Sequence, residues 1–305
     1  MKLYPFVLLI FLCYLFVSCG HISKISEEPP PSFTAIKGIK YTEVKRRFNN
    51  GLSFTDQGFQ LEPEWNIYFN ADDSVRIYSP EKKQYMTYRI FHSHKALFQF
   101  AREWFRVQHV SKDSLIFQVM ELESRAVMED LSTITMTLYS ENYIKNVLKT
   151  TADKLKAPSK EDSLFIKYRA IQVNSNQDSA FAARNPVKLK SKSKISSVEK
   201  IKPSLDPYLG HVNRSEEYLY PEYLIKIKKA YQDFQYSFSV IVDHNGRMHF
   251  KQFLVAVEPE FMANKTTVAK GIIDIYLRNT LEITPGNTLG FPHSSVINLH
   301  VVGRK

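Results

Sequence analysis

The chain has 305 residues, of which 44% are hydrophobic and 13% aromatic, so wholesale disorder is excluded and one large or two ordinary hydrophobic cores can form. Its 17 tyrosines and 21 phenylalanines stand against only 10 glycines, a balance that favours sheets over a glycine-rich nucleotide-binding fold. The formal net charge of +10 could suggest nucleic acid or an anionic surface as a partner, but the excess is not evenly spread along the chain.

The chain opens with an apolar run at residues 3–17. A membrane-spanning helix needs roughly 20 apolar residues, so this run is short for a span, and Pro5 interrupts a continuous helix. Its length is instead typical of the apolar core of a signal peptide.

Residues 15–20 read Leu-Phe-Val-Ser-Cys-Gly, with apolar residues and a small residue before a cysteine. This pattern resembles the bacterial lipobox, although Phe16 stands where leucine is usual. The resemblance implies a signal peptide of residues 1–18, cleavage before Cys19, and acylation of the Cys19 thiol, for example with palmitate. The alternatives are an uncleaved membrane anchor and ordinary secretion.

The segment that follows fits an anchored chain. Cys13 and Cys19 are the two cysteines, so a mature chain beginning at Cys19 has no intramolecular disulfide and no thiolate metal site. Residues 19–36 are mostly polar and contain three consecutive prolines, which predicts a stiff lipidated tether. No aspartate follows Cys19, which by resemblance to lipoprotein sorting implies the outer membrane, with the chain facing the periplasm.

Residues 37–146 are predicted to form a β-rich domain. Residues 66–69 and 75–78 are the arms of a predicted hairpin. The segment HKALFQFAREWFR at 94–106 fits either an amphipathic helix or a deeply buried strand, because its alternation is imperfect. Further strands are predicted at 114–122 and 134–140.

Residues 147–216 are predicted to be a polar, partly disordered linker, with a surface helix at 142–156 and an added strand at 160–173 (KEDSLFIKYRAIQV). From Arg184 to Lys202 there are seven basic residues against one acidic residue. A flexible, solvated basic linker therefore explains most of the excess charge. No aromatic residue is interleaved there for base stacking, so no nucleic acid is expected as a partner.

Residues 217–305 are predicted to be a small α+β unit, and the whole chain is therefore assigned to the α+β class. After a short helix at 221–234, the order is strand, strand, helix, strand. The two arms of the hairpin at 236–257 flank an Asn-Gly turn. The remaining predictions are a helix at 266–281 capped by Asn264 or Thr266 and stopped at 284–286, and a last strand at 294–302.

Four short motifs accompany that order: FSVIVDHNGRM at 238–248, Pro285-Gly286, Gly290-Phe291-Pro292 and an upstream Tyr220-Pro221. With them, this unit resembles the carboxy-terminal domain of TonB-family proteins. The resemblance implies an exposed strand edge that pairs with an extended partner segment, and the last strand, 295–302, is the expected edge. The expected cleavage removes the inner-membrane helix by which family members engage a proton-driven motor, so energy transduction does not follow from the fold.

Candidate catalytic and metal-binding residues are few. His92 and His94 could share a strand face and a metal, but no nearby Cys, Asp or Glu completes the set, which favours surface or turn histidines. Neighbouring carboxylates do not converge across a cleft and are expected to solvate loops. No nucleotide-binding, esterase or zinc-protease motif occurs, so no catalytic residue, metal or cofactor is expected. The neighbouring carboxylates assigned to loop solvation are Glu62 and Glu64, Asp72 and Asp73, and Glu258 and Glu260.

Taken together, the sequence predicts a non-enzymatic cell-envelope lipoprotein that binds a protein or peptide in the periplasm. The alternatives are a TonB-like energy transducer for outer-membrane transport and an envelope enzyme with a site in residues 37–146.

Overall fold

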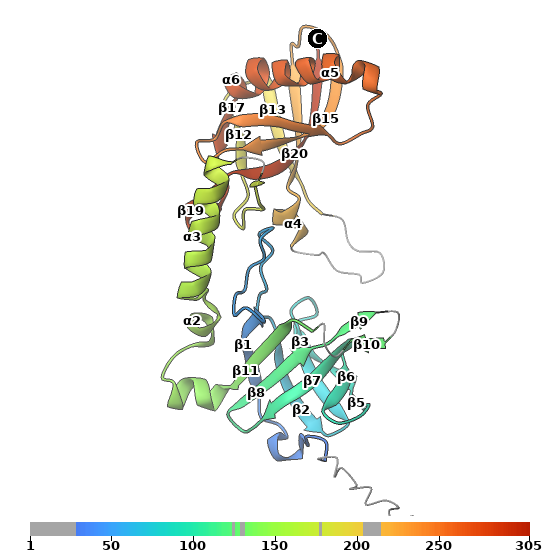
Figure 1. Ribbon diagram of the computed structural model, residues 1–305, viewed down its shortest axis with the longest axis vertical. Helices are drawn as coiled ribbons and strands as arrows, with labels where there is room; N and C mark the ends of the chain where they lie inside the picture. Colours follow the sequence, from blue (N-terminus) through green and yellow to red (C-terminus); the bar gives the residue numbers. More distant parts are fainter. Residues whose placement is uncertain (1–28, 124–125, 129–131, 177–178, 204–214) are drawn as a thin grey trace, which may run out of the picture.

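The computed structural model describes residues 29–123, 126–128, 132–176, 179–203 and 215–305 (Figure 1). Cys19 and the rest of the predicted signal lie outside the described residues. The described chain contains two large sheets, one in each half of the sequence, and a helix runs between them (Figure 1).

The first sheet has nine strands in the order β4-β3-β2-β1-β11-β8-β7-β6-β5 and is antiparallel throughout. It curls into a nearly closed barrel (Figure 1), and its two end strands are joined through Ile90 alone. Its strands are β1 (Tyr41–Phe48), β2 (Asn66–Ala71), β3 (Ser74–Ser79), β4 (Gln84–Arg89), β5 (Phe91–His92), β6 (Leu97–Phe100), β7 (Glu103–Val110), β8 (Ser114–Val119) and β11 (Ile134–Ser140), preceded by the short helix η1 (Thr34–Ile36). A separate hairpin is formed by β9 (Glu121–Glu123) and β10 (Ala126–Met128).

The β-rich character predicted for this half is confirmed, including the hairpin of β2 and β3 and the strands β8 and β11. The segment 94–106 contains two strands, β6 and β7, and no helix. The chain reverses between them at Ala101 and Arg102, whose φ angles of 50° and 68° are those of a tight hairpin turn. Phe100 and Phe105 on the two sides of that turn stack with ring centroids 4.5 Å apart and fill the barrel core.

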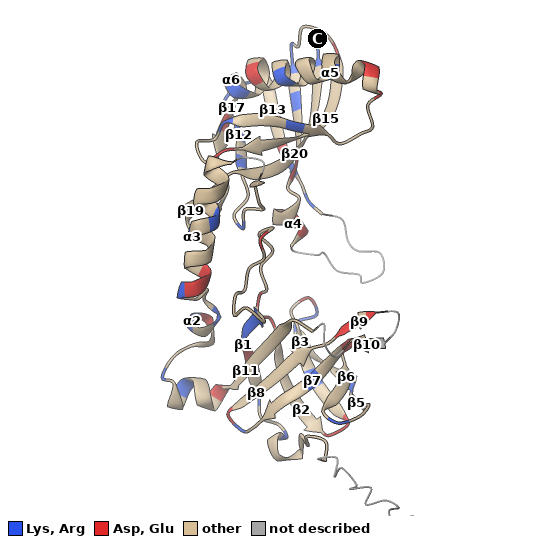
Figure 2. Cartoon of the chain, in the orientation of Figure 1, with Lys and Arg blue, Asp and Glu red and all other residues tan. Residues whose placement is uncertain are grey.

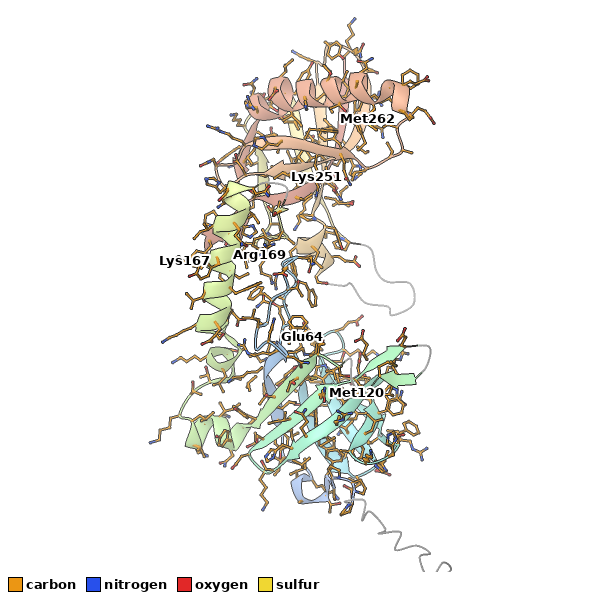
Figure 3. All side chains as sticks on the ribbon, viewed as in Figure 1. Glu64, Met120, Lys167, Arg169, Lys251 and Met262 are labelled. Carbon is orange, nitrogen blue, oxygen red and sulfur yellow. The ribbon has the colours of Figure 1, made fainter. Side chains whose placement is uncertain are left out.

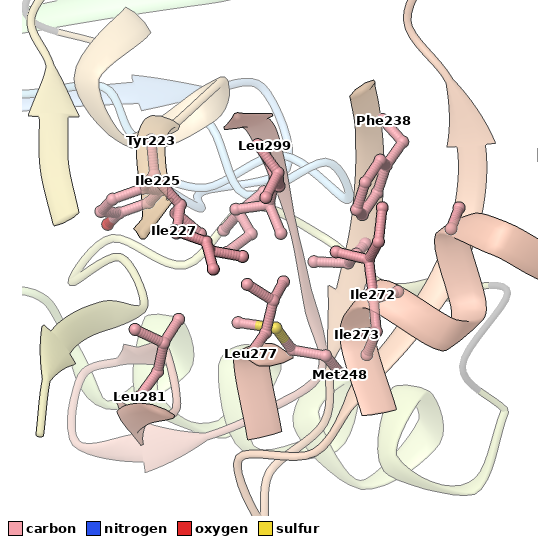
Figure 4. Packing of buried hydrophobic residues seen from close by; sticks show 14 of the residues in the cluster. Tyr223, Ile225, Ile227, Phe238, Met248, Ile272, Ile273, Leu277, Leu281 and Leu299 are labelled. Atoms are coloured by element: carbon pink, nitrogen blue, oxygen red, sulfur yellow. The ribbon is translucent and has the colours of Figure 1, made fainter. Parts of the chain in front are cut away.

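The second sheet has five strands in the order β13-β14-β20-β15-β16. Strand β20 lies at its centre, parallel to β14 and antiparallel to β15. A long helix covers one face of the sheet (Figure 1), and Ile273 and Leu277 from it pack on Met248 and Leu299 (Figure 4). The elements are β13 (Ser196–Ile201), β14 (Glu222–Lys228), β15 (Phe234–Val242), β16 (Met248–Phe253), β20 (Ser295–Arg304), and the consecutive helical segments α5 (Pro259–Gly271), η4 (Ile272–Leu277) and α6 (Arg278–Thr280).

Two predictions in this half were wrong in detail. The segment after Pro221 is strand β14 and not a helix, because Tyr223, Ile225 and Ile227 alternate with partly or fully exposed residues and reach the core. The long helix begins at Pro259, before both predicted caps, since a proline in the first turn loses no hydrogen bond and has a helical φ. It ends at Thr280, where strand β17 (Leu281–Thr284) begins and pairs with β12 (Lys188–Ser191).

The predicted flexible basic linker is also wrong over its described residues. Strands β12 and β13 occupy the lysine-rich segment, with Val187, Leu189 and Val198 turned to the core and the lysines of β12 exposed. The predicted strand at 160–173 is instead helix α3 (Lys160–Ser175). The predicted surface helix is interrupted, as η2 (Tyr143–Val147) and α2 (Ala152–Lys156). Short elements complete the fold: α4 (Glu216–Leu219), β18 (Asn287–Thr288) and β19 (Phe291–Pro292).

Helix α3 is fixed to the barrel at its amino end. Ser159 and Asp162 form a capping box, each side chain accepting from the other's backbone N–H. The fully buried Asp162 carboxylate also accepts from the Ser53 N–H at 2.8 Å and pairs with Arg47 of β1 at 2.9 Å. Burial alone would raise the Asp162 pKa, but the backbone N–H groups and Arg47 outweigh it and hold that pKa below its ordinary range.

At its other end α3 is fixed to loops of the carboxy-terminal half. Asn174 accepts from the Ser294 N–H at 3.0 Å and donates to the Pro292 carbonyl at 3.2 Å. The loop at 49–65 makes a second connection, because the Ala182 N–H donates to the Gln57 carbonyl at 3.0 Å. The two sheets are therefore linked by a helix and a loop that are both hydrogen-bonded into each half.

Candidate peptide-binding edge

The last strand, which the sequence predicted to be the binding edge, is not an edge of the sheet. Strand β20 pairs with β14 on one side and β15 on the other, so its backbone groups are used within the sheet and it cannot accept a further strand. The edges of the five-stranded sheet are β13 and β16. The start of β13 is approached by β12, where Ser191 and Ser196 hydroxyls lie 2.7 Å apart. Strand β16 is the more open edge.

A rigid turn positions β16. The Asp243 carboxylate accepts from the backbone N–H groups of Asn245 and Arg247, each at 2.9 Å, and lies 3.3 Å from His249 Nε2. Burial of Asp243 acts to raise its pKa, and these donors overcome that effect and lower it, so the carboxylate stays ionised. Gly246 has a φ of 80°, and a Cβ there would lie 2.9 Å from the Ile283 carbonyl oxygen, so the turn is held against β17.

The free side of β16 presents main-chain donors and acceptors. The Asp243 N–H donates to the Arg247 carbonyl, which makes Asp243 and Arg247 a hydrogen-bonded pair of the antiparallel ladder. Hydrogen-bonded and non-hydrogen-bonded pairs alternate along such a ladder. The N–H and C=O groups of Met248 and Phe250 therefore point away from β15. These are the groups that an added strand would bind.

An apolar surface adjoins the end of this strand. Leu254 and Val255 follow β16, and Phe261 and Met262 lie in the first turns of α5. Their side chains are 37%, 60%, 50% and 43% exposed, respectively. We call these four residues the edge patch. Figure 3 shows Met262 at one end of α5 and Lys251 on the sheet below it. The edge patch can bury apolar side chains of a segment that pairs with β16.

The edge also carries features that limit indiscriminate pairing. The ladder between β15 and β16 has a bulge at Ser239 and Val240, which displaces Lys251 from direct pairing. Bulges and lysines on edge strands oppose aggregation between identical edges. A partner strand must therefore match the outline of this edge.

The other sequence-predicted residues do not assemble into a catalytic or metal site. His92 Nε2 lies 2.9 Å from the Lys95 carbonyl oxygen, and His94 Nδ1 lies 3.0 Å from the Ser93 hydroxyl, as in a turn. No group of three or more His, Cys, Asp or Glu side chains in the described part of the chain could hold a metal ion.

Two of the carboxylates assigned to loop solvation have structural partners that sequence reasoning missed. Asp72 accepts from the Thr34 hydroxyl at 2.7 Å and from the Phe33 N–H, so it fixes η1 to the barrel. These hydrogen bonds, the Thr34 one foremost, lower the pKa of Asp72. Glu62 pairs with Arg184, and this ion pair joins the 49–65 loop to the carboxy-terminal half.

A row of polar side chains on the five-stranded sheet has the composition of a catalytic triad. The Ser237 hydroxyl lies 2.9 Å from His300 Nδ1, and His300 Nε2 lies 3.7 Å from Glu222. Ser237 sits within β15 between two paired strands, so the neighbouring N–H groups belong to the sheet ladder and cannot form an oxyanion hole. This row is explained by cross-strand hydrogen bonding.

Within the described residues, none of the helices has both the length and the apolar character needed to cross a membrane. No protein-family model and no curated protein matches this chain, so its function is argued from the geometry of the edge.

Proposed function

We propose that the chain is a non-enzymatic cell-envelope lipoprotein that binds an extended segment of a partner protein along β16. The observation that carries this proposal is the open edge of β16 beside the exposed edge patch. Main-chain hydrogen bonds to Met248 and Phe250 would supply affinity, and contacts with the edge patch would supply selectivity.

The location belongs to the same proposal. The lipobox-like residues 15–20 support anchoring by a lipid on Cys19, with the chain facing the periplasm at the outer membrane. Likewise, the order β15, β16, α5, β20 supports a TonB-like carboxy-terminal domain as a proposal. In Figure 2, most residues of both sheets are neither basic nor acidic, and no aromatic residue is interleaved among the lysines of residues 184–202, which favours a protein partner over nucleic acid.

Anchoring is tested with radiolabelled palmitate in cells that express the full chain. We expect label on the wild type and on Cys13→Ala, which leaves the lipobox cysteine intact, and loss of label on Cys19→Ala. The intact mass of the wild type should lack residues 1–18. A wild-type protein that keeps those residues and carries no Cys19-dependent lipid would contradict the anchor.

Strand addition is tested by fluorescence anisotropy with capped hexapeptides of alternating β-branched or aromatic and polar residues. Peptides that bind the full chain should lose binding when N-methyl groups replace the N–H groups that face β16. The same modification on the outward-facing N–H groups should leave binding unchanged, because only one side of the peptide pairs with the edge.

Protein variants test the edge patch with the same peptides. Phe261→Ser and Met262→Ser should each weaken binding about tenfold, because loss of a buried apolar contact costs on the order of 1–2 kcal/mol. Tyr168→Ser is the matched control, since Tyr168 is an exposed aromatic residue on α3, away from β16. Equal sensitivity to both N-methyl patterns, or equal loss in the control variant, would overturn the proposed function.

A further inference from the structure

A cavity of about 360 Å³ lies at the start of β16. Three elements meet there: the turn between β15 and β16, the end of the long helix, and β17. Met248 and Ile273 are buried and give the cavity an apolar base, whereas Arg247 and Arg278 are exposed. We call it the end pocket; its lining residues are Gly246, Arg247, Met248, Ile273, Arg278 and Ile283.

The charged side chains that line the end pocket are basic. Two of its lining residues are arginines and none is acidic. Arg278 is paired with Asp274 at 2.9 Å, one turn earlier on the helix. Within the described residues the Arg247 guanidinium has no ion-pair partner. A guanidinium above an apolar base suits a carboxylate attached to an apolar group.

The pocket is also preformed. Its turn is held by the Asp243 carboxylate, which accepts from the Arg247 N–H, and by the close approach of Gly246 to the Ile283 carbonyl. Binding would therefore require little ordering of the backbone, which preserves affinity.

The position of Arg247 selects one direction for an added strand. Arg247 immediately precedes Met248, the first residue of β16. A strand added antiparallel to β16 ends at Arg247 with its carboxylate, whereas a parallel strand begins there with its ammonium group. The guanidinium attracts the first and repels the second.

We infer that the end pocket binds the C-terminal carboxylate and the last apolar side chain of a peptide that pairs antiparallel to β16. The inference rests on the proposed function and makes it specific: the partner segment is a free C-terminus.

The test compares each binding hexapeptide as its free acid and as its C-terminal amide, both acetylated at the amino end. We expect the free acid to bind the full chain at least tenfold more tightly. In Arg247→Gln the preference should fall to about twofold or less, while the affinity of the amide stays unchanged. Arg304→Gln is the matched control, because Arg304 is an exposed arginine at the end of β20.

A second probe separates the pocket from strand pairing. N-acetyl-leucine is too short to form a strand, and it should shift the backbone amide NMR signals of Gly246 and Arg247, whereas N-acetyl-leucine amide should not. Equal binding of acid and amide hexapeptides would overturn the inference and leave the proposed function intact. If no capped hexapeptide binds but N-acetyl-leucine shifts those signals, the proposed function fails and the pocket remains a carboxylate site without an added strand, which also overturns the inference.

Discussion

The two sheets of this molecule differ in how far their edge strands are open to a partner. The nine-stranded sheet curls into a nearly closed barrel whose core contains stacked aromatic rings. Its two end strands, β4 and β5, are separated in the chain by Ile90 alone. The five-stranded sheet stays open, with a helix over one face and β16 at its edge. A curled sheet brings its two edges toward each other, whereas the open sheet leaves the main-chain groups of β16 available. A binding site for an extended segment is therefore expected on the second sheet.

The connection between the sheets has an apolar cluster and an ion pair of its own. A small apolar cluster of Phe54, Ile166, Val173 and Phe181 fills the space between α3, the 49–65 loop and the segment that precedes β12. Arg184 strengthens it, because its guanidinium pairs with Glu62 and lies 4.6 Å from the centre of the Tyr218 ring. The two sheets should therefore unfold together.

The largest expected effect comes from breaking that connection at Gly58. A Cβ at Gly58, whose φ is 87°, would lie 2.2 Å from the Ala182 carbonyl oxygen, so Gly58→Ala must push the 49–65 loop away. Gly51→Ala is the matched control, since Gly51 has a φ of 81° in the same loop and open space around it. We expect losses of unfolding free energy of about 3 kcal/mol for Gly58→Ala and about 1 kcal/mol for Gly51→Ala.

The readout uses the position of the tryptophans. The chain has two, Trp65 and Trp104, and both belong to the barrel half. Tryptophan fluorescence therefore follows the barrel, while far-ultraviolet circular dichroism follows both sheets. In urea the two transitions should coincide for the wild type and for Gly51→Ala and separate for Gly58→Ala. Equal behaviour of the two variants would show that the loop contact does not couple the sheets.

The sequence located strands well where alternation was regular and a turn residue was clear. The arms of the hairpin at Asn245-Gly246 and the strand β11 are examples. Helix α3 was missed because its apolar residues lie on both faces. Ile166, Ala170 and Val173 are buried, while Leu164, Tyr168 and Ile171 are exposed, so no single apolar stripe marks a helix. The capping box at Ser159 and Asp162 was the signal that could have identified it.

The candidate site shows a different limit. The sequence predicted a binding edge in the carboxy-terminal half but assigned it to the last strand. Local patterns carry no information on strand order, and β20 returns between β14 and β15 through pairings that are distant in sequence. The end pocket likewise depends on Arg247 and Ile283, which come together only when the turn packs on β17.

A smaller effect should separate the two sheets by their response to acid. His293 is completely buried beside the open sheet and stacks on Phe181 at 3.8 Å. Its Nδ1 lies 3.1 Å from the Ser294 carbonyl oxygen, so it donates there, and its Nε2 accepts from the Thr288 hydroxyl at 3.0 Å. Both partners suit neutral imidazole, and burial lowers the pKa of His293 to about 4.

The sign of the pH effect follows from this depressed pKa. In the unfolded chain His293 is protonated below about pH 6.5, whereas in the folded chain it is protonated only below about pH 4. The free energy of unfolding therefore decreases as the pH falls from about 6.5 to about 4. Between pH 7 and pH 5 the loss attributable to His293 should be about 2 kcal/mol. Urea unfolding followed by circular dichroism should show it in the wild type and in the exposed-histidine control His244→Gln. His293→Gln should lack that increment, and an unchanged pH dependence in this variant would mean that His293 has the same pKa in the folded and unfolded chain. The same pH series in Gly58→Ala extends the comparison, because the two sheets should unfold separately in that variant. The acid-induced loss of stability should then remain in the circular dichroism transition and be absent from the tryptophan transition, which follows the barrel alone.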